Sequence, residues 1–338
     1  MSLSTRILAG TGAVVMATGA MLFAQGGDAA KVMADMRQAL GGEQKLAAVK
    51  TLSATGKTSR AMGEQSIAGD YELAMELPDK YMTKQAMGQT PVGAIAVTAG
   101  FSGSGLIQDT ELPPQLAGMR AMISLGGASP NASPEEKAAA SAKTVTAMKQ
   151  EFAKLALGMF GASFPQAPMT FSYNGTAEAP DGKADVIDVK GPGDFVGKLF
   201  IDQKSHLPLM LSWMGKEPMQ MTSMNGARPG GAGAGGGAQI MTFGGGGGAT
   251  AGRGANANMT PEERDKMVKD LEAQMKDAEA KRKTVEFRMF YADYQKVDGI
   301  QLPHRFQQSV AGTPSSEITI EKYKVNPKID PKKFETVK

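Results

Sequence analysis

The sequence contains no cysteine, so disulfides cannot stabilise the fold and no lipidated cysteine can anchor the chain to a membrane. Histidine is almost absent, with two residues in the whole chain. His206 and His304 lie far apart in the sequence, and neither has a local partner for a zinc site or for base catalysis. We therefore expect a protein that is not an enzyme and that carries no cofactor.

A strong excess of charge of either sign is also missing. Lysine and arginine number 37 against 34 aspartates and glutamates, which gives a formal net charge of +3 at pH 7. A nucleic-acid-binding face normally needs a clear basic excess, so we expect no nucleic-acid partner. The chain is expected to be a monomer.

Long hydrophobic runs are lacking except near the N-terminus, where Ile7–Phe23 is apolar. Arg6 precedes this run and Ala24 offers a small residue for cleavage, which is the pattern of a signal peptide. The run is too short and too rich in glycine and alanine for a typical membrane span. We expect residues 1–24 to be a signal peptide and the rest of the chain to be periplasmic. An uncleaved N-terminal anchor is the alternative.

Aromatic residues are scarce at 6%, whereas glycine and methionine are abundant, with 42 and 24 residues. Many glycines lie in Gly226–Asn258, which cannot bury enough apolar surface to offset its ordering entropy. A mostly charged helical pattern, Thr260–Lys283, follows it. We expect the loop and the helix to form one insertion at about 226–283. Most methionines are expected to fill an apolar core.

An earlier insertion is expected at about 111–168. Ser133 to Glu136 reads Ser-Pro-Glu-Glu, which is a helix capping box with proline at the first helical position. The predicted helix carries apolar residues at helical spacing on one face, so it should pack against another element. These residues are Val145, Met148, Phe152, Leu155 and Met159.

Much of the remaining chain alternates apolar and polar residues with a period of two, which indicates half-buried antiparallel strands. Around residue 74, one face carries Tyr71, Leu73, Met75 and Leu77, and the other carries Glu72, Ala74 and Glu76. Asp298-Gly299 is a strong hairpin signal between two further strands. About eleven strands are predicted in all. The fold class is therefore mainly β with α, built on one curved antiparallel sheet.

Two short motifs match known sites only in part. Gly56-Lys57-Thr58 resembles the end of a phosphate-binding loop, but Thr51 stands where the first glycine should be. Met219, Met221 and Met224 are closely spaced thioethers, a ligand type that favours Cu(I). A Met-rich strand end and loop is the simpler interpretation of these methionines, and copper binding is kept as a third hypothesis.

Turn and strand-end residues resemble the outer-membrane lipoprotein-sorting family of bacteria, the LolA/LolB-like proteins. The resemblance spans about residues 28–338 apart from the two insertions, and it indicates a divergent relative. It implies a half-open, strongly curved sheet, an incomplete barrel whose concave apolar side is closed by helices; in the family's carrier this cavity holds acyl chains. The stretches are Ala39–Leu46, Val49–Leu52 with Gly56, Leu77–Tyr81, Lys198–Asp202 with Leu207-Pro208, Tyr291–Tyr294, Val297–Pro303, and Val325–Pro327 before Phe334.

Two hypotheses of function follow. The first is a non-enzymatic periplasmic protein that binds a lipid, a lipoprotein acyl chain or another hydrophobic ligand in a concave cavity covered by a helical lid. The second is an envelope protein-interaction or sensing module without a lipid ligand, in which the same residues simply form a closed core. The candidate wall residues are Tyr71, Leu73, Met75, Leu77, Phe287, Met289 and Tyr291, and the candidate lid residues are Val145, Met148, Phe152 and Leu155.

Overall fold

The structure, a computed structural model, describes residues 25–62, 65–90, 93–114, 133–180, 182–218 and 280–336. The expected signal peptide lies outside the described residues. So do the glycine-rich stretch and nearly all of the charged helix after it, together with Met219, Met221 and Met224.

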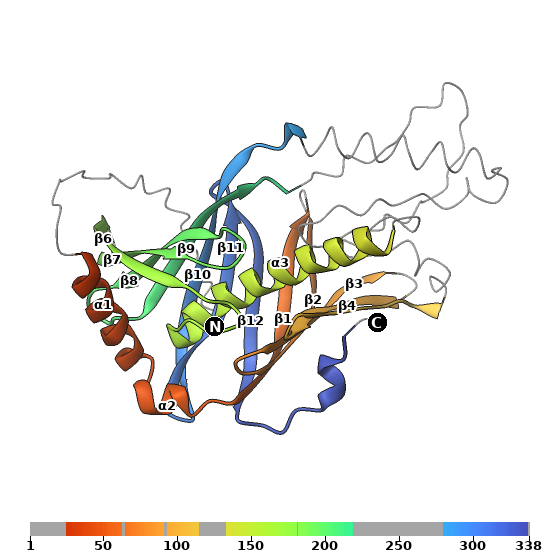
Figure 1. The fold of residues 1–338 in the computed structure, drawn as a ribbon, viewed down its shortest axis with the longest axis horizontal. Helices are drawn as coiled ribbons and strands as arrows, with labels where there is room; N and C mark the ends of the chain where they lie inside the picture. The colour runs from red at the N-terminus through yellow and green to blue at the C-terminus, as the bar shows by residue number, and fades with distance from the viewer. Residues whose placement is uncertain are drawn as a thin grey trace, which may run out of the picture.

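Twelve antiparallel strands form a single sheet in the order β5-β4-β3-β2-β1-β12-β11-β10-β9-β8-β7-β6. The sheet curves strongly and is not closed into a barrel, because β5 and β6 form its two edges (Figure 1). This architecture confirms the predicted curved, open antiparallel sheet. The strands are β1 Thr51–Met62, β2 Gln65–Glu76, β3 Lys80–Thr90, β4 Gly93–Ser102, β5 Gly105–Glu111, β6 Thr170–Ala179, β7 Gly182–Lys190, β8 Val196–Asp202, β9 Pro208–Lys216, β10 Thr284–Val297, β11 Ile300–Val310 and β12 Thr313–Val325.

The hairpin between β10 and β11 forms where Asp298-Gly299 predicted it. Asp298 and Gly299 both have positive φ, of 49° and 89°, and Val297 pairs with Ile300 across the turn. Positive φ at both central residues is the geometry of a type I′ turn, whose twist matches that of the strands. Tyr291 and Tyr294 lie on one continuous strand, β10, with a left-handed residue, Asp293, between them.

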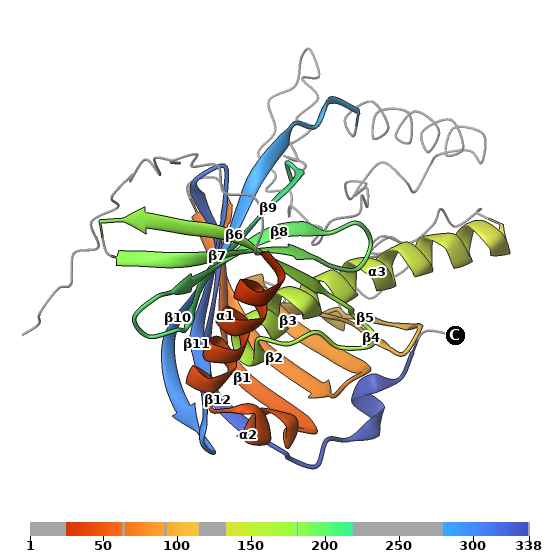
Figure 2. The same cartoon turned by 60° about the vertical axis from the view of Figure 1, so that its left-hand side comes forward.

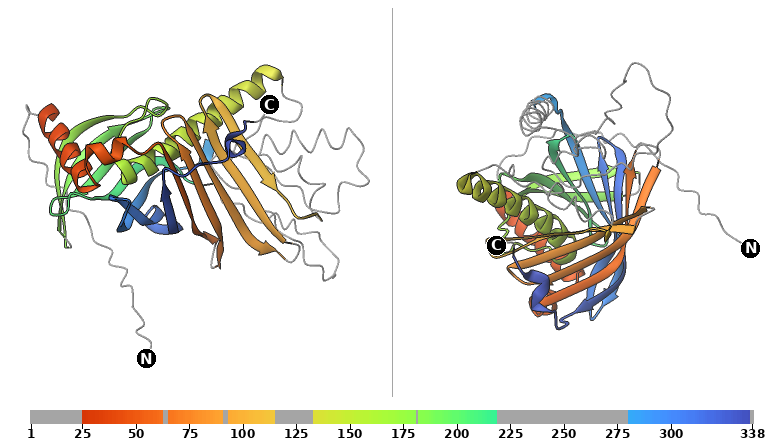
Figure 3. Two further views of the ribbon diagram at one scale, coloured as in Figure 1. Left: turned by 90° about the horizontal axis from the view of Figure 1, so that it is seen from below. Right: turned by 90° about the vertical axis from the view of Figure 1, so that its right-hand side faces the viewer.

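The helices α1 (Gln25–Ala39) and α3 (Pro134–Phe160) lie on the concave side of the sheet (Figures 2 and 3). The α1 helix contacts β6, whereas α3 crosses the sheet and contacts β4, β5, β9 and β11. The short helices α2 (Glu43–Ala47) and η2 (Pro331–Phe334) precede β1 and follow β12.

The ends of α3 follow from local sequence. The Ser133 side chain accepts from the Glu136 backbone N–H at 3.2 Å, and Ser133 N–H donates to the Glu136 carboxylate at 2.7 Å. These bonds complete the predicted capping box and satisfy donors that the first turn leaves open. Gly161 ends the helix with a left-handed φ of 56°, a conformation that glycine adopts without a Cβ clash.

The outer, convex face of the sheet departs from the predicted pattern. Ala74 was expected to point outward with Glu72 and Glu76, yet its side chain is fully buried. The C-terminal segment folds back over this face, and Phe334 of η2 packs there with Ala74, Met82 and Ile107. Alternation along β2 shows which residues point away from the main core. It does not show that Ala74 is covered there by Phe334, some 260 residues later in the sequence.

The main core occupies the concave side and joins the sheet to α1 and α3 in one continuous cluster. Methionine contributes to it as expected, since Met36, Met75 and Met159 are fully buried. The flexible thioether side chain fills irregular space between a curved sheet and a crossing helix.

Candidate functional site

The predicted wall residues of β2 point into the concave side and are covered there. Tyr71, Leu73 and Met75 are each at most 4% exposed, and Leu77 is half-buried just beyond the strand. On β10, Met289 and Tyr291 are buried and Phe287 is half-buried. The structure thus brings the two predicted walls into one apolar cluster, although they are more than 200 positions apart in sequence.

The predicted lid residues belong to the same cluster. Val145, Phe152 and Leu155 of α3 are buried, and Met148 is half-buried. The Phe152 ring meets Tyr81 and Phe101 edge-on, with centroid distances of 5.6 and 5.7 Å. In this conformation the lid residues fill the concave face between the walls, so walls and lid form a continuous core.

Two tyrosine hydroxyls connect β10 to the backbone of α3. Tyr291 Oη donates to the carbonyl of Lys154 at 2.8 Å, and Tyr294 Oη donates to the carbonyl of Gly158 at 2.9 Å. Arg37 of α1 donates to the carbonyl of Phe160 at 2.8 Å. The C-terminal half of α3 is therefore held by polar bonds as well as by apolar packing. Residues 134–143, in contrast, are mainly exposed.

A charged residue, which the sequence analysis missed, lies within this apolar region. Lys154 is only 5% exposed. Its ammonium nitrogen lies 2.7 Å from the Glu151 carboxylate, 4.3 Å from the ring centroid of Trp213 and 5.6 Å from that of Phe195. The signal in the sequence was one lysine inside the otherwise apolar run Phe152–Phe160. Lysine is almost never buried without a partner, so this lysine, its carboxylate and its two aromatic rings form one unit.

The charge on Glu151 affects several groups of the concave side. Burial raises the pKa of Tyr71 and of Tyr291 well above the ordinary value, and the negative charge of Glu151 adds to this effect. Burial lowers the pKa of Arg60 to about 10, and Glu151 opposes that shift. Glu151 therefore acts electrostatically on the concave side, where its side chain remains 42% exposed.

His304 is half-buried in the fold, and His206 lies in a turn. His304 Nδ1 lies 2.9 Å from the carbonyl oxygen of Ile320, and its ring meets Tyr323 edge-on at 5.1 Å. His206 has a positive φ of 57° in the turn between β8 and β9. Within the described ranges, no group of three or more acidic, histidine or cysteine side chains is arranged to hold a metal ion.

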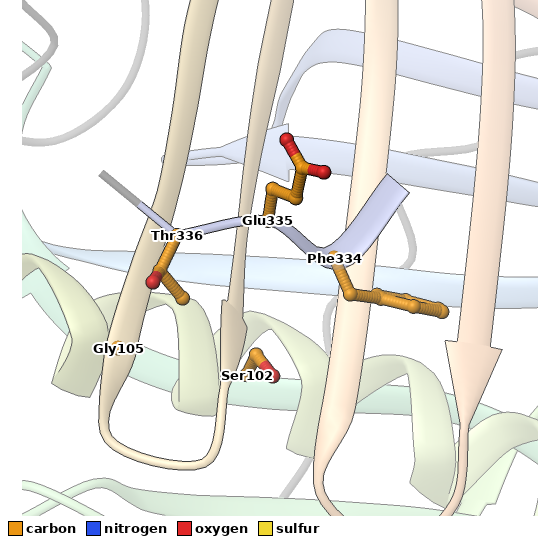
Figure 4. Close-up of a pocket in the computed structure, with 5 residues that line it drawn as sticks. All are labelled: Ser102, Gly105, Phe334, Glu335 and Thr336. Atoms are coloured by element: carbon orange, nitrogen blue, oxygen red, sulfur yellow. The ribbon is translucent and has the colours of Figure 1, made fainter. Parts of the chain in front are cut away.

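An open pocket of about 720 Å³ lies away from the concave side (Figure 4). It is formed by the turn between β4 and β5, with Ser102 and Gly105, and by the C-terminal residues Phe334, Glu335 and Thr336. Ser102, Glu335 and Thr336 give it polar groups. This pocket is therefore not the apolar cavity that the sequence predicted.

Among the helices of the described residues, none combines the length and apolar character needed to cross a membrane.

No family model matches the sequence, and no curated protein matches it. Among solved structures, similar ones are a DUF1329 family protein from Desulfovibrio piger, a putative outer membrane lipoprotein-sorting protein domain from Vibrio parahaemolyticus and a LolA superfamily protein from Nitrosomonas europaea. Their sequence identities are 9%, 9% and 8%, and their TM-scores are 0.44, 0.42 and 0.42. The matches cover 90%, 91% and 91% of this chain and 96%, 96% and 98% of those chains.

These neighbours include the family that the turn and strand-end residues resemble.

Proposed function

We propose that the chain is a non-enzymatic binding protein of the bacterial periplasm that takes an apolar ligand between the concave face of its sheet and α3. The ligand would be a lipid or the acyl chain of a lipoprotein. One observation carries this proposal: the apolar concave face is covered by a helix that crosses it, and the sheet does not close on itself. A helix that covers the sheet can move away without breaking hydrogen bonds between strands. A strand that closed the sheet into a barrel could not.

The contacts of α3 support such an exchange. Phe152, Leu155 and Met159 are held on the sheet by apolar packing, which an alkyl chain can replace in kind. Each methylene group that leaves water contributes about 0.8 kcal/mol, so a long acyl chain can offset the displacement of several side chains. The N-terminal segment 134–143 is mainly exposed, so movement of the helix can start there.

A specific observation favours the second candidate, a protein-interaction module without a lipid ligand. The concave face is filled, while Val196 and Met214 are 59% and 61% exposed. The strand register places Gly197 opposite Trp213, so Val196 and Met214 are neighbours at the next position, on the outer face of β8 and β9. An exposed apolar pair outside a closed core is what a docking surface for another protein would need.

The experiment that tests the first proposal is titration of the purified chain with a fluorescent fatty acid such as 11-(dansylamino)undecanoic acid. Native mass spectrometry of protein from its own periplasm would run in parallel. We expect saturable binding, together with a co-purified lipid. Leu155→Asp should weaken binding by at least about tenfold, because it places a charge against the apolar sheet. Lys143→Asp, on the exposed part of the same helix, is the matched control.

A loss of folding in Leu155→Asp is separated from a loss of binding by thermal unfolding followed by circular dichroism. Met148→Glu is a second variant, at a half-buried position of the same helix face, where a charge disturbs the core less. If the wild-type chain neither binds the probe nor carries a lipid, the carrier function is wrong and the interaction module takes its place.

A further inference from the structure

The ion pair of Lys154 and Glu151 is buried on the lysine side only. The side chain of Lys154 is 6% exposed, whereas that of Glu151 is 42% exposed. Both lie on α3 and are three residues apart, so they meet on one flank of the helix. The cation is thus fixed in the protein interior, and its carboxylate partner reaches it from the solvent side.

The surroundings of Lys154 are suited to hold a cation in place. The Trp213 ring, whose centroid is 4.3 Å from the ammonium nitrogen, is stacked on Phe287 at 5.5 Å with an interplanar angle of 13°. Phe195 lies on another side, tilted relative to Trp213. The face of an aromatic ring attracts a cation, most strongly when water is excluded. The two rings therefore hold the Lys154 ammonium group in place, even when a different anion takes the position of the Glu151 carboxylate.

The cost of moving each partner decides which one can be exchanged. Moving the Lys154 side chain would take its four-carbon stem out of packed surroundings and its ammonium group away from the rings of Trp213 and Phe195. Turning Glu151 into solvent costs little, because nearly half of its side chain is already there. A buried ammonium ion must nevertheless keep an anionic partner. An anion that arrives as Glu151 leaves would satisfy that requirement.

We propose that Lys154 is the recognition site for the acidic head group of an amphiphilic ligand, whose carboxylate or phosphate replaces Glu151 on the ammonium group. This inference rests on the proposed function, because the ligand's alkyl chain would lie on the adjacent concave face. Trp213 and Phe195, whose rings flank the Lys154 ammonium group, belong to the same apolar cluster as Phe152 and Tyr291 of that face. The exchange makes and breaks one ion pair and changes no covalent bond.

The alternative role for Lys154 is purely structural, as a contact that holds α3 against β9. The two roles differ in charge selectivity. A structural lysine affects ligands of either charge equally through the stability of the helix cover. A recognition lysine favours anionic head groups over neutral and cationic ones that carry the same alkyl chain.

The test uses four amphiphiles with the same twelve-carbon chain, each kept below its micelle concentration. Tridecanoate and dodecyl phosphate carry the two anionic heads, dodecyl maltoside carries no charge, and dodecyltrimethylammonium carries a cation. Trp213 is the single tryptophan of the chain and lies beside the site, so its fluorescence reports binding there directly. Isothermal titration calorimetry provides the affinities.

We expect wild-type protein to prefer an anionic amphiphile over dodecyl maltoside by at least about tenfold, as a charged hydrogen bond allows. Glu151→Gln removes the competing carboxylate with little change in shape, so it should raise the affinity for the anionic amphiphiles and leave that for dodecyl maltoside unchanged. Lys154→Met keeps an apolar side chain at the position and should abolish the preference. Glu135→Gln, in the exposed first turn of α3, is the matched control.

The outcomes separate this inference from the proposed function. If all four amphiphiles bind equally and Glu151→Gln changes no ratio between them, the head-group site is wrong and the apolar binding site stands. If none binds, the proposed function itself fails. Should Lys154→Met not fold, Glu151→Gln still decides the question. The stronger of the two anionic ligands tells whether the head is a carboxylate or a phosphate.

Discussion

Gly158 of α3 lies directly against the ring of Tyr291 of β10. A Cβ atom at position 158 would be 2.4 Å from Cδ1 of that ring, well inside van der Waals contact. The hydroxyl of the same tyrosine bonds the carbonyl of Lys154, one turn earlier. Glycine therefore sets the distance between α3 and the sheet, and the tyrosine sets their register.

Gly158→Ala is expected to destabilise the protein, although alanine is the better helix former by about 1 kcal/mol. The added methyl group forces the helix or Tyr291 to move, and overpacking of this kind costs about 1–3 kcal/mol. Urea unfolding measures the difference. Ala139→Gly, at an exposed position of α3, should show only the loss of helix propensity. A Gly158→Ala variant more stable than wild type would contradict the close approach.

Tyr294→Phe is expected to destabilise the protein more than Tyr291→Phe does. The carbonyl of Gly158 is among the last four of α3 and has no partner within the helix, so loss of the Tyr294 hydroxyl leaves it unsatisfied. The carbonyl of Lys154 lies further inside and retains its helical N–H partner. We expect about 1 kcal/mol for Tyr291→Phe and more for Tyr294→Phe. Chemical denaturation measures both losses of stability. Equal losses for the two variants would show that the position of the accepting carbonyl in the helix does not matter.

Stability is expected to fall steeply above pH 10. Burial raises the pKa of each of five tyrosines above the ordinary value of 10.0, so these phenols stay neutral in the folded chain and ionise once it unfolds. A folded pKa above the unfolded one gives stability that is present below the unfolded pKa and lost as pH rises past it. Each such tyrosine removes about 1.4 kcal/mol per pH unit above 10. The tyrosines are Tyr71, Tyr81, Tyr291, Tyr294 and Tyr323.

Absorbance at 295 nm and far-UV circular dichroism, recorded on the same alkaline titration, check this prediction. The bulk of the tyrosinate signal should appear together with the loss of β-structure. Tyr173 lies on edge strand β6 and is only partly buried, so it is the one expected to ionise first. Ionisation of most tyrosines in a chain that is still folded would refute the prediction.

Phe334→Ala is expected to lower the stability by about 3 kcal/mol, as for other large buried side chains. Phe334 closes the small outer core with Ala74, Met82 and Ile107, on the opposite side of the sheet from α3 (Figure 4). Differential scanning calorimetry should show a lower Tm. Binding of the fluorescent fatty acid at a temperature where the variant is folded should be unchanged. Glu335→Ala, at the exposed neighbouring position, is the control. A strong loss of probe affinity in folded Phe334→Ala would link the two faces and contradict this separation.

Local sequence patterns determined much of the fold. Alternation predicted which side chains of β2 face the core, Asp298-Gly299 predicted the hairpin, and the capping box at Ser133 predicted the start of α3. Each of these features depends on residues within a few positions of one another, so the physical preference is expressed in the sequence itself. The apolar stripe of α3 likewise predicted that the helix would pack.

Tertiary structure decided what each apolar face meets. The pairing of Leu52 with Val325 joins the two ends of the described chain in the centre of the sheet, and no local pattern contains it. The same holds for Ala74 beneath Phe334 and for Lys154 between two aromatic rings. Alternation predicts that a side chain will be buried, but it does not predict which residues will cover it. Burial of the Lys154 charge becomes favourable only when aromatic faces from distant segments join the carboxylate of its own helix around it, and that arrangement exists only in the folded chain.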